Sequence, residues 1–201
     1  MISKRSATRG VIFRVALTGI CAALIEAVKL ALAFIPNVEG VTLLTALFGY
    51  CFGWTGVLSS IIFVSIEPLI YGYNTWVLSY YLYWPFVAFV FMLLGKQRIR
   101  NRVALTAVAV GLTVWFGVLT SLVDVGLFTG FLTNFWYRFR IYYLRGTWFY
   151  VVQIVCNAVV FPLLFRPLSR LLEQLGERFM PKKPKTGEKF MPEMQKNEKN
   201  T

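Results

Sequence analysis

Long apolar runs are the feature of this sequence that most restricts its fold. The first, Val11 to Ile35, is 25 residues long and mostly apolar. As a helix it would extend about 37 Å at 1.5 Å per residue, more than the roughly 30 Å hydrocarbon core of a bilayer. The chain also has only 15% charged residues and a mean hydropathy of +0.61. A soluble domain usually has about a quarter charged residues, so the sequence predicts an integral membrane protein.

Six apolar runs succeed one another with short connections. They are Val11–Ile35, Val41–Phe52, Gly56–Tyr71, Trp76–Gly95, Val103–Phe131 and Thr147–Phe165. The second run is shorter than a comfortable span, so we expect it to start in the preceding loop, to tilt, or to be shielded by neighbouring helices. The sequence therefore predicts an all-α integral membrane protein, a bundle of six transmembrane helices.

The predicted bundle occupies residues 11–172 and is flanked by basic segments. Residues 1–10 form a basic N-terminus, and residues 173–201 continue an amphipathic helix into a basic tail that we expect to be disordered. The helical spacing of leucines begins at Leu168 and extends to Phe179, as in helices that lie on a membrane surface.

The distribution of basic residues predicts the orientation of the chain. Most of the 21 Lys and Arg residues lie at the N-terminus, between Lys96 and Arg102, or after Phe165. These three regions are separated by even numbers of predicted crossings, which is the positive-inside pattern. Both termini are therefore expected in the cytoplasm. The pattern also accounts for the net charge of +12 without a nucleic-acid partner.

Polar and aromatic side chains gather toward the predicted external ends of the runs. The candidate substrate-binding residues are Asn37, Glu39, Glu67, Tyr71, Asn74, Trp76, Tyr80, Trp84, Asp124 and Asn157. Rings with a few amides and carboxylates suit a pocket for a small organic molecule, opening outward. Two alternatives remain open: aromatic rings also settle at membrane interfaces, and the acids could form salt bridges with Arg138, Arg140 or Arg145.

The first run has two further features. Glu26 and Lys29, three residues apart on one helical face, are expected to neutralise each other rather than to contact a ligand. A stripe of small residues follows the same helix: Ala16, Gly19, Ala23 and Ala27. Because small side chains let helices approach closely in lipid, the stripe predicts either an internal helix contact or a docking surface for a separate protein.

Several catalytic classes are excluded by missing residues. The chain has no His, so zinc-protease motifs and His-dependent triads cannot form. The sequence also lacks the G-x-S-x-G elbow and the G-x-x-x-x-G-K-[ST] phosphate loop, so this chain cannot hydrolyse ATP by the P-loop route. The three cysteines lie inside apolar runs and are expected to be packing residues rather than disulfides or metal ligands. We expect a protein that is not an enzyme and holds no metal or cofactor.

The sequence resembles a family of uptake proteins in three segments. They are FRVALTGICAALIEAV in the first run, FIPNVEGVTLLTALFGYCFGWTGVL around the second, and IEPLIYGYNTWVLSYYLYWP leading into the fourth. In these segments the chain is similar to the substrate-binding S components of energy-coupling factor (ECF) transporters. The similarity in overall pattern extends from Arg9 to Leu172. These are bacterial and archaeal uptake systems for vitamins and other micronutrients.

The resemblance implies a six-helix S component in the bacterial cell membrane, with a pocket open to the outside. It implies two kinds of protein partner, a transmembrane T subunit and two cytoplasmic ATPase subunits that use the ATP. In the family, an A-x-x-x-A motif on the first helix faces the T subunit. Ala23 and Ala27 match that motif here, and Ala16 and Gly19 extend it with one departure from alanine.

Other functions are compatible with the same residues. An ion- or proton-coupled carrier would use Glu26, Glu67 or Asp124 as a relay. A membrane-embedded enzyme acting on a lipid-linked substrate would use a carboxylate and would need acids grouped at one membrane face. A structural assembly subunit would bind no small molecule.

Overall fold

The computed structural model describes residues 2–35, 38, 40–129 and 134–179. Within these ranges the chain is helical and forms no strand. The helices are α1 (Ile2–Leu32), α2 (Val41–Phe52), α3 (Trp54–Tyr71), α4 (Trp76–Lys96), α5 (Arg102–Thr129), α6 (Phe135–Val160), the π-helical turn η1 (Phe161–Phe165) and α7 (Arg166–Phe179). The all-α prediction is confirmed for this part of the chain.

Five of the described helical segments are long and apolar enough to cross a membrane. They are Gly10–Leu32, Trp54–Tyr71, Trp76–Lys96, Arg102–Leu127 and Phe135–Arg178. The remaining apolar helix, α2, has 12 residues, about 18 Å of helix. Eight of its residues are buried, so neighbouring helices shield this short element, which is one of the three arrangements expected from its length.

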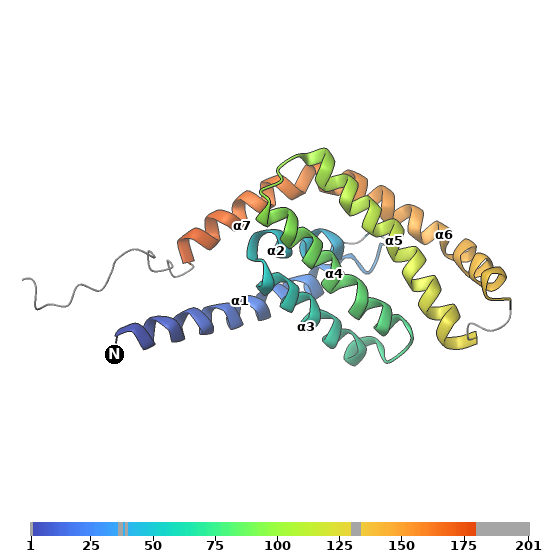
Figure 1. The fold of residues 1–201 in the computed structure, drawn as a ribbon, viewed down its shortest axis with the longest axis horizontal. Coiled ribbons are helices and arrows are strands. Elements are labelled where there is room, and N and C mark those ends of the chain that lie inside the picture. The colour runs from blue at the N-terminus through green and yellow to red at the C-terminus, as the bar shows by residue number, and fades with distance from the viewer. Residues whose placement is uncertain (1, 36–37, 39, 130–133, 180–201) are drawn as a thin grey trace, which may run out of the picture.

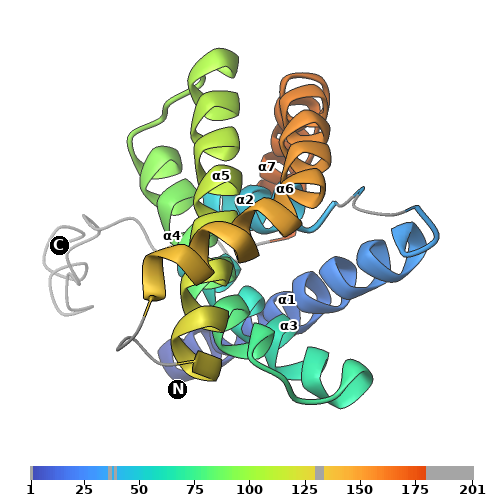
Figure 2. The same cartoon turned by 90° about the vertical axis from the view of Figure 1, so that its right-hand side faces the viewer.

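Helix α2 lies in the middle of the molecule. It packs most extensively against α4, and also against α3 and α1, while α5 and α6 form a pair that contacts α4 through α5. Figure 1 shows the long helices arranged around α2, and Figure 2 shows α1 and α3 on one side of it with α5, α6 and α7 on the other. Helix α4, which packs on α2, α3 and α5, thus links the two groups of long helices.

Glycines allow this close packing. A Cβ on Gly49 of α2 would overlap the backbone of Ala88 on α4, and a Cβ on Gly95 of α4 would overlap the backbone of Tyr50 on α2. Small residues at helix crossings let backbones approach closely, which adds dispersion contacts where lipid supplies no hydrophobic driving force. Gly53, between α2 and α3, has a φ of 62°, a conformation that favours glycine and permits the abrupt turn.

The last long helix differs from the prediction. It begins at Phe135 rather than near Thr147, so the segment expected to be an external loop is helical from residue 135 onward. The rings of Phe135, Phe139 and Tyr143 are four residues apart and stack with centroid distances of 6.4 and 5.9 Å. This spacing places them on one helical face, and their mutual contact favours helix over loop.

The C-terminal part of the described chain agrees better with the prediction. Helix α7 follows α6 without a break, through the π-helical turn η1, and it is strongly amphipathic, as the leucine spacing indicated. The π-helical turn between them buries Phe161 and Phe165, whose rings lie 5.7 and 5.5 Å from that of Phe91 on α4. The tail expected to be disordered, residues 180–201, lies outside the described residues.

Candidate functional site

A cavity of about 270 Å³ lies where the end of α1, the start of α2, α3 and α4 meet. Its lining is mostly apolar and aromatic. The lining residues are Lys29, Leu32, Ala33, Ile35, Val38, Val41, Phe63, Tyr71, Tyr80 and Trp84. Lys29 is the one charged side chain among them. Such a combination of apolar walls with one strong polar group is typical of sites for small organic molecules.

Helical spacing brings the rings to the cavity. On α3, Phe63 and Tyr71 are separated by eight residues, about two turns, with Glu67 midway on the same face. On α4, the rings of Trp76, Tyr80 and Trp84 recur every four residues and meet edge to face. Their successive centroid distances are 4.9 and 5.8 Å. Two helices thus present opposing aromatic faces, and such edge-to-face contacts hold each ring in place.

The Lys29 ammonium lies among these rings. Its Nζ forms an ion pair with Oε2 of Glu67. It also lies 4.4 Å from the ring centroid of Tyr71, 5.6 Å from that of Tyr80 and 5.9 Å from that of Phe63. All three distances fall within the range of cation–π attraction. The lysine is therefore held by one carboxylate and three aromatic rings, with 25% of its side chain still exposed.

A second carboxyl group lies behind this ion pair. Glu26 is only 8% exposed, and neither of its carboxyl oxygens has a hydrogen-bond partner among the described residues. It interacts electrostatically with both Glu67 and Lys29. The same part of the chain leaves Oε1 of Glu67 and Nε1 of Trp84 unpartnered. Two carboxyl groups share one ammonium, so the group lacks one positive charge when all three are ionised.

This charge deficit is energetically important because both carboxyl groups are buried. An uncompensated buried charge costs several kcal/mol, so such a group takes up a proton or finds a cation. The described residues contain no group of three or more His, Cys, Asp or Glu side chains that could hold a metal ion. The positive charge that balances Glu26 would come from a proton or from a bound cation.

The structure brings together only some of the predicted binding residues. Tyr71, Tyr80 and Trp84 line the cavity. Glu67 lies behind the lining, paired with Lys29, and Trp76 packs on Tyr80. Asn37 and Glu39 lie outside the described residues.

Asp124 and Asn74 belong to a separate cluster. Asp124 accepts hydrogen bonds from Oγ1 of Thr75 and from the hydroxyl of Tyr142, the latter at 2.7 Å. The Asn74 side chain accepts a bond from the Thr75 backbone N–H at 2.7 Å. These bonds tie the α3–α4 connection to α5 and α6, so the geometry gives both residues a positioning role for that connection.

Asn157 also lies away from the cavity. It is fully buried on α6, and its Nδ2 donates to Oγ1 of Thr113 on α5 at 2.9 Å. The Thr113 hydroxyl in turn donates to the Ala109 carbonyl at 2.9 Å. A buried amide bonded across two helices is typical of membrane helix packing. It joins α5 to α6.

The direct partner of Lys29 differs from the expected one, although Glu26 still interacts electrostatically with Lys29. The sequence favoured neutralisation of Glu26 by Lys29 within α1, whereas Lys29 pairs with Glu67 on α3. Helical spacing made the local pair possible, but the packing of α1 on α3 offers a fully buried carboxylate to the same ammonium. Salt bridges from Glu67 or Asp124 to external arginines were the alternative. In the structure Glu67 pairs with Lys29, and Asp124 accepts hydrogen bonds from hydroxyl groups.

The sequence interpretation missed seven of the ten lining residues, including Lys29 and Phe63. A signal for both was present. A lysine and a glutamate in separate apolar helices are expected to pair with each other, because an ionisable group in a membrane span needs a partner. Phe63 precedes Glu67 by four residues and Tyr71 by eight, which places it on the same face.

The small-residue stripe of α1 faces away from the bundle. All four of its members are exposed: Ala16, Gly19, Ala23 and Ala27. A Cβ on Gly19 would meet no atom within 4 Å. The adjacent stripe is the buried one, and it comprises Thr18, Cys21, Ala22, Ile25 and Glu26. Of the two predicted roles, internal packing does not apply to these four residues within the described chain.

Comparisons of this chain with protein-family models, with curated proteins and with solved structures found no match. The function proposed below therefore depends on three features of this chain: the cavity, the charges beside it and the exposed face of α1.

Proposed function

We propose that the chain is the substrate-binding S component of an ECF-type uptake transporter in the bacterial cell membrane. It captures a vitamin or another small micronutrient from outside and releases it inward when a T subunit and two ATPase subunits hydrolyse ATP. The observation that carries the proposal is the cavity of about 270 Å³, with its aromatic walls and a single lysine. Its volume suits one small organic molecule.

As an S component, the chain would cross the membrane six times. Five are the long apolar helices, and α2 is a short crossing enclosed by α1, α3 and α4. Six crossings return the chain to the side on which it started, so both termini would lie in the cytoplasm, as the positive-inside pattern requires. The cavity then opens at the external ends of α1, α3 and α4, where a ligand arriving from outside would reach it.

The exposed stripe of α1 supports a protein partner. Bulky apolar side chains such as Ile20 and Leu24 are exposed on the same helix, but the stripe itself leaves room for a second helix to approach. In the proposed assembly the T subunit occupies this room. Docking and ligand binding would then use opposite faces of α1, since Lys29 points to the bundle and Ala23 away from it.

The cavity is tested by ligand retention. Protein purified gently from its own host is analysed by native mass spectrometry, and the small molecules released on denaturation are identified. We expect a stoichiometric small molecule. Ala33→Trp should abolish its retention because the indole fills the cavity, whereas Ala158→Trp, on an exposed part of α6, should not. A clean apo mass for the unmodified protein, or equal retention by both variants, would contradict the proposal.

The docking surface is tested separately. We expect Ala23→Trp to prevent co-purification with the T subunit while ligand retention is unchanged, because bulk on a close-approach stripe blocks the partner helix. Ala107→Trp, at an exposed position of α5, is the matched control. Equal yields of the complex from both variants would show that the stripe contacts lipid only.

A second candidate function, an ion- or proton-coupled carrier, is favoured by one observation. Glu26 and Glu67 are buried beside a single lysine, an arrangement that can take up and release a proton. The two candidates differ in their energy source. Uptake that persists in cells lacking every T subunit would favour the carrier, and uptake that disappears with the T subunit favours the S component.

A further inference from the structure

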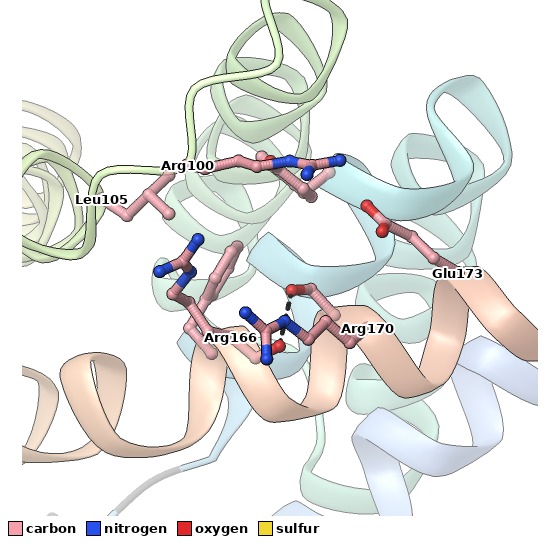
Figure 3. A pocket seen from close by; sticks show the side chains of 8 residues that line it. Arg100, Leu105, Arg166, Arg170 and Glu173 are labelled. Atoms are coloured by element: carbon pink, nitrogen blue, oxygen red, sulfur yellow. Dashed lines mark hydrogen bonds between the residues drawn. The ribbon is translucent and has the colours of Figure 1, made fainter.

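A second, smaller cavity lies at the other end of α2 from Lys29. Its volume is about 60 Å³, and its lining includes Tyr50, Arg100, Arg166, Ser169, Arg170 and Glu173. Figure 3 shows Arg100 in the connection before α5, and Arg166, Arg170 and Glu173 on α7, around this cavity. The cavity has less than a quarter of the volume of the Lys29 cavity, so the space suits a group the size of a phosphate rather than an organic nutrient.

The cavity carries excess positive charge. Three guanidinium groups line it, against one carboxylate, that of Glu173. None of the three arginines forms an ion pair within 4.0 Å in the part of the chain that the structure describes, where the pair found is Lys29 with Glu67. With all groups ionised, the lining therefore has a surplus of two positive charges.

The hydroxyl groups of this lining are already used. The Tyr50 hydroxyl donates to the Ile99 carbonyl at 3.0 Å, and the Ser169 hydroxyl donates to the Arg166 carbonyl at 3.0 Å. The donors that remain are guanidinium N–H groups, which have no acceptor capacity. The preferred ligand is therefore an anion with several acceptor oxygens, and the planar guanidinium matches phosphate oxygens two at a time.

The position of the arginines along the helices indicates where this phosphate comes from. Arg100 follows the apolar helix α4, and Arg166 follows directly after Phe165, where the apolar run of α6 and η1 ends. Helix ends of this kind lie at the depth of lipid headgroups. Next to the lining, Val103 and Leu163 are 76% and 64% exposed, which offers apolar surface to acyl chains.

We propose that Arg100, Arg166 and Arg170 form a binding site for the phosphate of an anionic phospholipid headgroup. A phosphomonoester headgroup, with a charge of about −1.5 to −2, matches the surplus of the lining best. Basic pockets between membrane helices are suited to such headgroups, and each neighbouring Lys or Arg strengthens binding about fivefold. The site is separate from the Lys29 cavity and does not depend on the transport proposal.

The test is a lipid titration of the full-length protein in detergent, followed by native mass spectrometry. The probes are phosphatidic acid, phosphatidylglycerol and phosphatidylcholine with identical acyl chains. We expect retention in that order. The double variant Arg166→Gln/Arg170→Gln should bind phosphatidic acid roughly 25-fold more weakly, the product of two fivefold losses. The control Arg140→Gln/Arg145→Gln removes the same charge from exposed positions of α6 and should leave retention unchanged.

A third variant has the opposite expected sign. Glu173→Gln removes the one carboxylate from the lining and should strengthen phosphatidic acid binding at least about twofold, through lost repulsion. A general loss of folding would not produce this gain. Weaker binding by this variant would contradict the proposed electrostatics.

Inorganic phosphate distinguishes the two sources of the phosphate group. Suppose that millimolar phosphate binds the unmodified protein, that the double variant loses this binding, and that lipid retention does not change. The site then binds free phosphate, and the lipid proposal is overturned. Equal retention of all three lipids by unmodified and double-variant protein would overturn it as well.

Discussion

The ion pair between Lys29 and Glu67 gives the sharpest prediction about this structure, because its partners differ in burial. The Glu67 side chain is 1% exposed, whereas that of Lys29 is 25% exposed. Removing the lysine with Lys29→Met leaves a fully buried carboxylate beside Glu26. Removing the carboxylate with Glu67→Gln leaves an ammonium that still reaches the cavity and still lies against the rings of Tyr71 and Tyr80.

The two losses should therefore be unequal. Breaking a buried pair so that one charge is left uncompensated costs about 3–5 kcal/mol, and we expect this range for Lys29→Met. The remaining cation–π contacts, worth roughly 0.5–2 kcal/mol each, should limit the loss in Glu67→Gln to about 1–2 kcal/mol. The double variant removes both charges, so it should be more stable than Lys29→Met alone by about 1–3 kcal/mol.

The measurement is thermal unfolding in one detergent, followed by tryptophan fluorescence. For a chain of this size 1 kcal/mol corresponds to roughly 2–4 °C in Tm, so Lys29→Met should lower Tm by about 6–20 °C and Glu67→Gln by about 2–8 °C. Lys96→Met, at the exposed end of α4, is the matched control and should have little effect. A larger loss for Glu67→Gln, or simple addition of the two losses in the double variant, would refute this account of the pair.

Two further predictions concern the packing around the site. Gly49→Ala should destabilise the protein by about 1–3 kcal/mol because the new Cβ overlaps the Ala88 backbone. Gly111→Ala should be neutral or stabilising, because a Cβ there meets no atom within 4 Å. Thermal unfolding of both variants tests this prediction, and equal changes in stability would contradict the close approach of α2 to α4. Asp124→Ala should lower the free energy of unfolding by roughly 1–2 kcal/mol, because it removes the acceptor of the Thr75 and Tyr142 hydroxyl groups. It should also speed amide hydrogen exchange in the α3–α4 connection. Unchanged exchange there would argue against the positioning role of Asp124.

The sequence determined which segments are helical and apolar, because the length and composition of a run are local properties. The starts of α2 and α4 at Val41 and Trp76 were predicted to the residue, since loop residues before them interrupt the apolar pattern. The start of α6 was not, because polar and aromatic residues around Arg140 resemble an interfacial loop in composition although they form a helix. Composition alone does not separate these two conformations at a membrane interface.

The partners of the charged residues were decided by tertiary structure alone. Glu26 and Lys29 are neighbours on a helix, and helical spacing alone does not decide whether Glu26 or Glu67 pairs with the ammonium. Likewise, Tyr71, Tyr80 and Trp84 converge on one cavity while Asp124 is held in a hydrogen-bond cluster with Thr75. Helical periodicity fixes the face on which a residue lies, but helix packing fixes what that face meets. That packing depends on close approaches such as that of Gly49 to Ala88, which involve residues far apart in the chain.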